Sequence, residues 1–253
     1  MKEAAFRTLQ LFAWLIVQPV SAHELKVAFD QDKAPYLWVE GREIKGLEYD
    51  IVMAALAASG DSVSAVLLPN RRVSAALTLG EADAVTGLLQ IGQAGEAFYS
   101  DLYLTYANMA ITRKSAGITI DRLEDIFGYS VAAWQMAWDD LGLGRLHPGG
   151  RDGLAYSEFT SQYRQTKFFW AGRADVDVVD RDIFLWYSRI LAKEMDTSDE
   201  VVFHDVVPVV RVRAAFRFRA DRDAFDAGMK TLRANGEIDR IYAKYGLINP
   251  DRR

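Results

Sequence analysis

The stretch that decides the fold of this chain is Gly46-Leu47-Glu48-Tyr49-Asp50, followed downstream by Gly80-Glu81-Ala82-Asp83-Ala84-Val85. Apolar residues recur at helical spacing after the first phrase, which predicts a helix over 50–59 with Gly60 as its C-cap. The second phrase begins with a glycine that closes another predicted helix, over 72–79, and ends in the first residues of a strand. Both phrases therefore mark junctions in an alternating pattern of helices and strands.

Strands and helices alternate throughout this first part of the chain. Short apolar segments at 25–29, 63–68 and 84–86 are predicted strands, and the two helices lie between them. A β-α-β-α-β order predicts a parallel sheet that is covered by helices. Ligands of such folds bind where the strands end. The polar side chains that follow these strands include Asp30, Asn70 and Gln90.

The same alternation restarts in the second part of the chain. Strands are predicted at 129–133 and 174–179, and helices at 162–171, 182–195 and 221–234. The last of these helices is predicted to begin with Asp221 as its N-cap. No low-complexity tract or long linker separates the two parts. We therefore expect an α/β protein with two lobes, parallel-rich sheets flanked by helices, and strands that cross between the lobes.

The N-terminus has the pattern of a secretory signal peptide over residues 1–22. Lys2 and Arg7 supply positive charge ahead of a short apolar core. Small residues then precede His23, where we expect the mature chain to begin. An uncleaved anchor or a buried first helix is the alternative, although the apolar segment is shorter than the roughly 20 residues that span a membrane. The chain contains no cysteine, which argues against a lipid anchor and predicts a freely diffusing periplasmic protein.

The composition suits a globular protein that does not bind nucleic acid. The 253 residues carry a formal net charge of −5, and half of them are hydrophobic. The histidines are scattered at His23, His147 and His204, without the spacing of a metal site. We therefore expect no metal site. We also expect no cofactor, and we expect the protein to be a monomer.

Several short phrases, taken in order, resemble the extracellular solute-binding proteins for polar amino acids, the family 3 type. Besides the two phrases above, they include Ala34-Pro35-Tyr36, Tyr99-Ser100-Asp101-Leu102-Tyr103 and Ala171-Gly172-Arg173-Ala174-Asp175. The resemblance implies the two-lobed periplasmic binding fold known as the Venus flytrap. It also implies a discontinuous first lobe at 23–107 plus 212–253 and a second lobe at 108–211.

The resemblance further implies a ligand-binding role for Asp180. The family commonly holds the ammonium group of an amino acid with an aspartate at this strand end, through a charge-assisted hydrogen bond. A structural role as a helix N-cap is the alternative. The arginine that holds the ligand carboxylate in the family is missing, because Gly95 stands at its position. Arg72 follows a strand end near a predicted helix N-terminus and is the expected substitute.

Aromatic and polar side chains complete the expected pocket. Tyr36 follows the first strand, and Trp134 lies where the second lobe of the family presents backbone N–H groups to a ligand. Trp134 and Trp138 are predicted to share one helix face, with core packing as the alternative for either ring. Lys33 stands where relatives often carry an aromatic residue, which predicts a more polar pocket. The remaining expected ligand contacts are Gln90, Asp30 and Asn70.

Three functions fit these residues. The first is periplasmic binding of a small polar solute, an amino acid or a related molecule, which hinge closure delivers to the permease of an ABC transporter. The second is a sensory or interaction module without transport. The third is an enzyme resembling the cyclohexadienyl dehydratases of the same fold, with Asp180 and Arg72 as acid/base and anion clamp. We expect the first, with no catalytic residues and with a permease or a sensor receptor as the protein partner.

Overall fold

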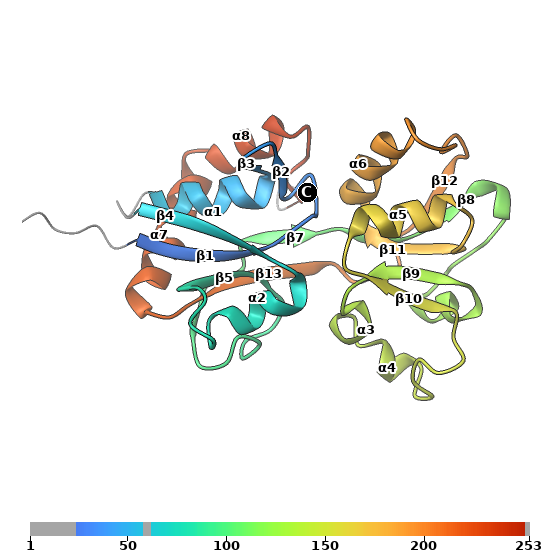
Figure 1. Ribbon diagram of the computed structural model, residues 1–253, viewed down its shortest axis with the longest axis horizontal. Helices are drawn as coiled ribbons and strands as arrows, with labels where there is room; N and C mark the ends of the chain where they lie inside the picture. The colour runs from blue at the N-terminus through green and yellow to red at the C-terminus, as the bar shows by residue number, and fades with distance from the viewer. Residues whose placement is uncertain (1–23, 58–61, 251–253) are drawn as a thin grey trace, which may run out of the picture.

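The computed structural model describes residues 24–57 and 62–250 and shows two lobes side by side (Figure 1). Each lobe is built on its own β-sheet with helices packed against it, so the expected two-lobed α/β fold is confirmed. The predicted signal peptide and the predicted C-cap at Gly60 lie outside the described residues. Within the described ranges, no helix is both long and apolar enough to cross a membrane.

The sheet of lobe 1 has the strand order β4-β1-β5-β13-β6, and β7 pairs with another part of β13. Its strands are β1 (Glu24–Asp30), β4 (Ser62–Leu68), β5 (Ala84–Leu88), β6 (Phe98–Tyr99), β7 (Leu104–Tyr106) and β13 (Val210–Phe216). β1 runs parallel to both β4 and β5, as the alternation predicted, whereas β13 runs antiparallel to β5. The carboxyl ends of the parallel strands point towards lobe 2 (Figure 1). A separate hairpin pairs β2 (Trp38–Glu40) with β3 (Glu43–Lys45).

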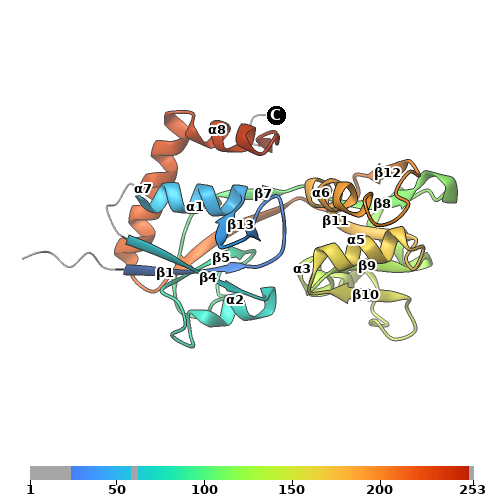
Figure 2. The same cartoon turned by 45° about the horizontal axis from the view of Figure 1, so that its top comes forward.

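Helices cover both faces of this sheet. They are α1 (Leu47–Ala57), α2 (Asn70–Ala76), α7 (Arg219–Ala234) and α8 (Glu237–Lys244). α2 lies on one face, and α1 and α8 lie on the other (Figure 2). α7 packs closely on α1, because Gly228 has no side chain to hold the two backbones apart. The buried residues Ile51 and Phe225 extend this contact into the core of the lobe.

Lobe 2 repeats the arrangement with the strand order β10-β9-β11-β8-β12. Its strands are β8 (Asn108–Arg113), β9 (Val131–Trp134), β10 (Tyr156–Phe159), β11 (Val176–Asp180) and β12 (Val201–His204). Its helices are α3 (Ala137–Asp140), α4 (Leu143–Leu146), α5 (Gln162–Trp170) and α6 (Arg181–Leu191), with short 3-10 turns at η1 (Lys114–Ala116) and η2 (Leu123–Gly128). β9, β10 and β11 are parallel, and β8 and β12 close one edge in antiparallel fashion.

The chain passes between the lobes twice. β7 leads through Ala107 into β8, and β12 leads through residues 205–209 into β13 (Figure 1). Apart from the β2-β3 hairpin, the strands from 24 to 106 and from 210 to 216 therefore belong to the first sheet, and those from 108 to 204 belong to the second. Two short connections of this kind can act as a hinge, since few residues need to change backbone angles when the lobes move.

Two local predictions were wrong. Trp134 ends β9 and Trp138 lies in α3, with Met136 between them in a left-handed conformation at φ 74°, so the two rings do not share a helix face. α7 begins at Arg219 and has no side-chain cap, so Asp221 is not its N-cap. In both places the preceding loop determines where the helix begins, and tertiary contacts set the path of that loop. The spacing of residues along the sequence does not indicate this path.

The close contact between α1 and α7 gives a test of the packing of lobe 1. A Cβ atom at Gly228 would lie 2.1 Å from the backbone oxygen of Ala55, so the two helices must separate to admit it. We expect Gly228→Ala to lower the free energy of unfolding by about 1–3 kcal/mol, measured by urea denaturation. Gly128→Ala is the control, because a Cβ there meets nothing within 4 Å. Equal stability of the two variants would contradict this account of the packing.

Candidate functional site

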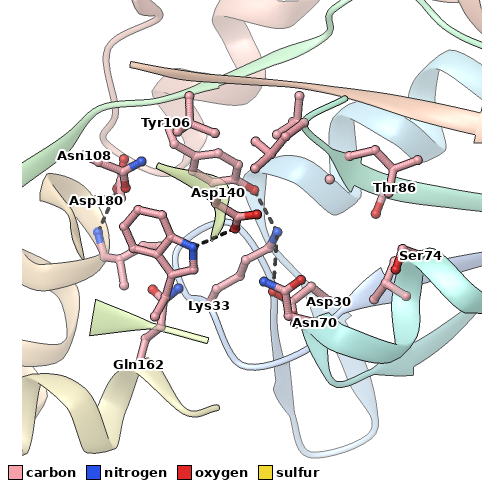
Figure 3. Close-up of a pocket in the computed structure, with 18 of the residues that line it drawn as sticks. Asp30, Lys33, Asn70, Ser74, Thr86, Tyr106, Asn108, Asp140, Gln162 and Asp180 are labelled. Atoms are coloured by element: carbon pink, nitrogen blue, oxygen red, sulfur yellow. Dashed lines mark hydrogen bonds and ion pairs between the residues drawn. The ribbon is translucent and has the colours of Figure 1, made fainter. Parts of the chain in front are cut away.

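A cavity between the lobes is lined by side chains from both of them (Figure 3). Its polar lining from lobe 1 comprises Asp30, Lys33, Asn70, Ser74, Thr86, Gln93 and Tyr106. Its polar lining from lobe 2 comprises Asn108, Trp134, Asp140, Gln162 and Asp180. Several of these residues end or follow parallel strands, which is where ligands bind in open α/β sheets.

The floor of the cavity holds a buried ion pair. The Lys33 ammonium lies 2.8 Å from Glu48 Oε2, and Glu48 at the start of α1 is completely buried. Tyr103 and Tyr106 donate their hydroxyl hydrogens to Glu48 over 2.5 and 2.8 Å, and Lys33 donates to the Tyr106 oxygen over 2.8 Å. Glu48 thus accepts three hydrogen bonds without contact with water.

The same contacts keep both members of the pair charged. Burial opposes ionisation of Glu48, but Lys33 and the two tyrosine hydroxyls outweigh it and lower the pKa of the carboxyl. Burial also opposes the charge of Lys33, yet Glu48 and Asp30 raise its pKa above the ordinary value. The ammonium is therefore engaged by Glu48 before any ligand enters.

Asp30, at the end of β1, is the second acidic group on the floor. Its side chain is 18% exposed, and its carboxylate lies 4.0 Å from the Lys33 ammonium. Burial raises the pKa of Asp30 to about 7, against the effect of Lys33 and with support from Glu48 and Asp32. At neutral pH this carboxyl therefore titrates inside the cavity.

Asp180 has both of the roles that the sequence left open. Its Oδ1 accepts from the backbone N–H groups of Asp182 and Ile183, which makes it the N-cap of α6. Its Oδ2 accepts from the Ala107 N–H at 2.8 Å and from the Tyr36 hydroxyl at 3.2 Å. The residue also lines the cavity, where burial raises its pKa to about 7.

Trp134 and Asp140 form the opposite wall. The Trp134 indole N–H donates to Asp140 Oδ2 over 3.1 Å, which holds the ring against the cavity (Figure 3). Burial raises the pKa of Asp140 to about 6, while the bond from Trp134 acts in the other direction. Trp134, Asp30 and Asn70 are therefore three predicted contacts that the structure brings to the cavity.

Three other predicted contacts lie outside the lining of this cavity. The Arg72 side chain is 57% exposed and points to Glu81, with its Nη2 2.8 Å from Oε1. Gln90 is exposed, and Gln93 from the same loop lines the cavity instead. Tyr36 packs its buried ring on Tyr106 at 4.6 Å and reaches the site only through its bond to Asp180. Arg72 is thus not placed to replace the missing arginine, because α2 turns it to solvent.

The sequence alone did not indicate most of the ion-pair network. Glu48 is part of the stretch that decides the fold. It lies 15 residues after Lys33 in the sequence, and the two meet only because the chain between them turns back. Tyr103 and Tyr106 join it from a segment more than 50 residues away. One signal in the sequence could have indicated the pair. Glu48 stands at a position with the spacing of the helix residues that face the core, and a buried carboxylate needs a partner of opposite charge.

The segment that carries Lys33 also joins the two lobes. Asp32 accepts hydrogen bonds from Ser161 at 2.7 Å and from Tyr187 at 3.1 Å, both in lobe 2. The Ala34 N–H donates to the Tyr187 oxygen over 3.2 Å. Trp38 of β2 packs on Trp186 of α6 with ring centroids 5.0 Å apart. The lobes are therefore in direct contact beside the cavity.

The ion pair predicts a non-additive mutational effect. Lys33→Met or Glu48→Gln alone should each lower the free energy of unfolding, by about 3–5 kcal/mol where a charge is left unpaired. The double variant should lose clearly less than the sum, because neither charge remains. Chemical denaturation of all four proteins measures this coupling. Strictly additive losses would show that the pair contributes no coupling energy.

The raised pKa of Asp30 predicts a pH dependence of stability. The contribution of Asp30 to the free energy of unfolding is fully present below the pKa of the unfolded chain, near 3.8. It is lost as pH rises through about 7, because the folded state must then bury a charged carboxylate. Asp30→Asn removes this group, so its unfolding free energy should fall less steeply between pH 4 and pH 8 than that of the parent. Asp152→Asn, in an exposed loop, should keep the parent slope. An unchanged slope in Asp30→Asn would contradict the burial effect.

Comparison with known proteins supports this view of the fold. The chain matches the family model of the bacterial extracellular solute-binding proteins, family 3, over residues 25–248. No curated protein matches the chain significantly. A histidine kinase sensor domain with similarity to periplasmic binding proteins is 20% identical with a TM-score of 0.75, over 89% of this chain and 97% of that one.

Two further solved structures share the architecture. An ancestral amino acid-binding protein, described as a precursor of cyclohexadienyl dehydratase, is 20% identical with a TM-score of 0.70, over 88% of this chain and 95% of that one. A substrate-binding protein of an ABC uptake transporter from Streptococcus pneumoniae, with bound histidine, is 17% identical with a TM-score of 0.69. The match covers 88% of this chain and 92% of that one. At these identities the likeness extends to the fold alone. Because the family model spans nearly all of the described residues, the chain belongs to the bacterial extracellular solute-binding proteins of family 3.

Proposed function

We propose that this protein binds a small polar solute in the cavity between its lobes and delivers it to the permease of an ABC transporter. The observation that carries the proposal is the cavity itself, whose polar lining comes from both lobes and includes residues at strand ends of each. A solute held there would contact both lobes at once and so favour their closed arrangement. We propose binding without turnover, by a monomer in the periplasm.

The predicted signal peptide supports the periplasmic location, as does membership of an extracellular family. The lobe division that we propose is 23–107 plus 212–253 for the first lobe and 108–211 for the second. The ABC uptake transporter protein among the similar structures supports a role in transport. The similar sensor domain supports a second candidate, in which the same closure is read by a receptor.

A ligand screen tests the proposal. The purified chain, refolded to remove carried-over solute, should gain thermal stability with at least one compound from a panel of amino acids, amines, small carboxylates and cyclic acids. Trp134→Ala should abolish that gain, because the ring lines the cavity. No stabilisation by any compound would contradict the proposal. Conversion of a cyclic acid to product would favour the dehydratase-like alternative instead.

The contacts between the lobes give a prediction about closure. Tyr187→Phe removes the hydrogen bonds to Asp32 and Ala34 without changing the cavity lining, so it should weaken ligand binding several-fold by favouring the open arrangement. Tyr163→Phe is the matched control, because its hydroxyl bonds to Glu194 within lobe 2. Stopped-flow fluorescence should show a faster dissociation rate for Tyr187→Phe only. Equal dissociation rates in both variants would show that these bonds do not govern closure.

Genetic tests separate the two candidate roles. Deletion of the gene should abolish cellular uptake of the identified solute if the protein serves a transporter. If uptake remains while the transcriptional response to the solute is lost, the sensor role replaces the transport role.

A further inference from the structure

The charges around the cavity are predominantly negative. Asp30, Asp140 and Asp180 line it, and Glu48 lies directly behind its floor. Lys33 is the only cation among the described residues of the lining. Four carboxylates and one ammonium give a net charge of −3 in and directly behind the cavity when all are ionised. The net charge is −1 when Asp30 and Asp180, whose pKa values burial raises to about 7, are both protonated. A buried excess of this size disfavours a second negative group and favours a cation.

The one cation of the described lining is already neutralised. The Lys33 ammonium contacts Glu48 and Tyr106 at 2.8 Å, and Asp30 lies on another side at 4.0 Å. A ligand carboxylate that approached Lys33 would also meet Asp30. The described lining contains no arginine, and the position of the family's carboxylate clamp is occupied by Gly95.

Two sets of backbone N–H groups in lobe 2, after β9 and at the start of α6, are also engaged. After β9, the N–H groups of Met136 and Trp138 donate to the carboxylate of Glu158 over 3.1 and 2.9 Å. The Gln135 N–H donates to the Phe159 carbonyl oxygen. At the start of α6, Asp180 takes the two free N–H groups that would otherwise attract an anion. The N–H groups of Met136, Trp138, Asp182 and Ile183 are therefore bound by the protein's own carboxylates.

Two features of the wall suit a nitrogen cation. Trp134 is largely buried, with 9% of its surface exposed, but it lines the cavity, where an aromatic ring can attract a cation. Asp140 supplies a negative charge at the edge of that ring. The buried Oε1 atom of Gln162, another lining residue, accepts no hydrogen bond from the described residues. It is a neutral acceptor ready for an N–H donor of a ligand.

We infer that the cavity takes an organic cation that lacks a carboxylate, such as a primary amine or a guanidine compound, in preference to the amino acid of the same side chain. This inference rests on the proposed function and names the solute class for that same cavity. The ligand ammonium or guanidinium would lie on Trp134 and face Asp30 and Asp140. An α-carboxylate would meet no unpaired cationic donor in the described lining, only neutral amide and hydroxyl groups.

Matched pairs of compounds test the inference directly. Calorimetric titration of the refolded chain at pH 7.5 compares agmatine with arginine, cadaverine with lysine, and histamine with histidine. We expect at least one amine to bind at least about tenfold more tightly than its amino acid, because the amine brings no carboxylate that must lose its water beside acidic side chains and without an unpaired cation. Tighter binding of the amino acid in every pair would overturn the inference, yet would support the proposed binding function.

Variants of the two carboxylates that face the ligand space sharpen the test. Asp140→Asn keeps an oxygen for the Trp134 N–H but removes the charge, and Asp30→Asn removes the charge that lies 4.0 Å from Lys33. Each should weaken amine binding about tenfold. Asp152→Asn in an exposed loop is the charge-matched control and should bind as the parent does. Both cavity variants remove buried negative charge, so we expect them to fold.

The outcomes distinguish the two proposals. Loss of amine affinity in Asp30→Asn and Asp140→Asn, but not in Asp152→Asn, supports the inference. Parent affinity in both cavity variants would overturn it, because the carboxylates would then not face the cation. Binding of small carboxylates or cyclic acids alone would also overturn it while leaving a binding function in place. If no compound binds at all, the proposed function fails together with the inference.

Discussion

The rest of the site depends on the buried ion pair between Lys33 and Glu48. Glu48 begins the helix that packs on the sheet of lobe 1, and it could not remain ionised there without the ammonium and the two tyrosine hydroxyls. Lys33 is in turn held at the floor of the cavity by that carboxylate. The pair therefore fixes the loop after β1 against the body of the lobe, and it determines the charge that a ligand meets.

The same loop links binding to the arrangement of the lobes. Within residues 31–38, Lys33 faces the cavity, while Asp32, Ala34 and Trp38 contact lobe 2. One short segment therefore both lines the cavity and contacts lobe 2. Short crossing strands leave the lobes free to respond, since these interlobe bonds lie in this segment rather than in the connections.

The cavity differs in charge from a site built for an amino acid zwitterion. Its carboxylates are either paired within the protein, as Asp180 and Glu48 are, or lie towards the ligand space, as Asp30 does. The backbone N–H groups after β9 and at the start of α6 are bound by Glu158 and Asp180. The chain keeps the fold of its family, and the described lining of its cleft carries more acidic than basic side chains.

The sequence by itself determined the two-lobed fold and which strand ends meet, because the alternation of helices and strands leaves few topologies and parallel strands end on one side. Asp30, Asn70, Trp134 and Asp180 were predicted to contact the ligand, and all four line the cavity. Only the tertiary structure decided where Arg72 and Gln90 point, since the rotation of a helix and the path of a loop are set by packing. The tertiary structure alone decided that Lys33 and Glu48 form a pair. Their contact requires the chain between them to turn back, and local sequence patterns do not specify that turn.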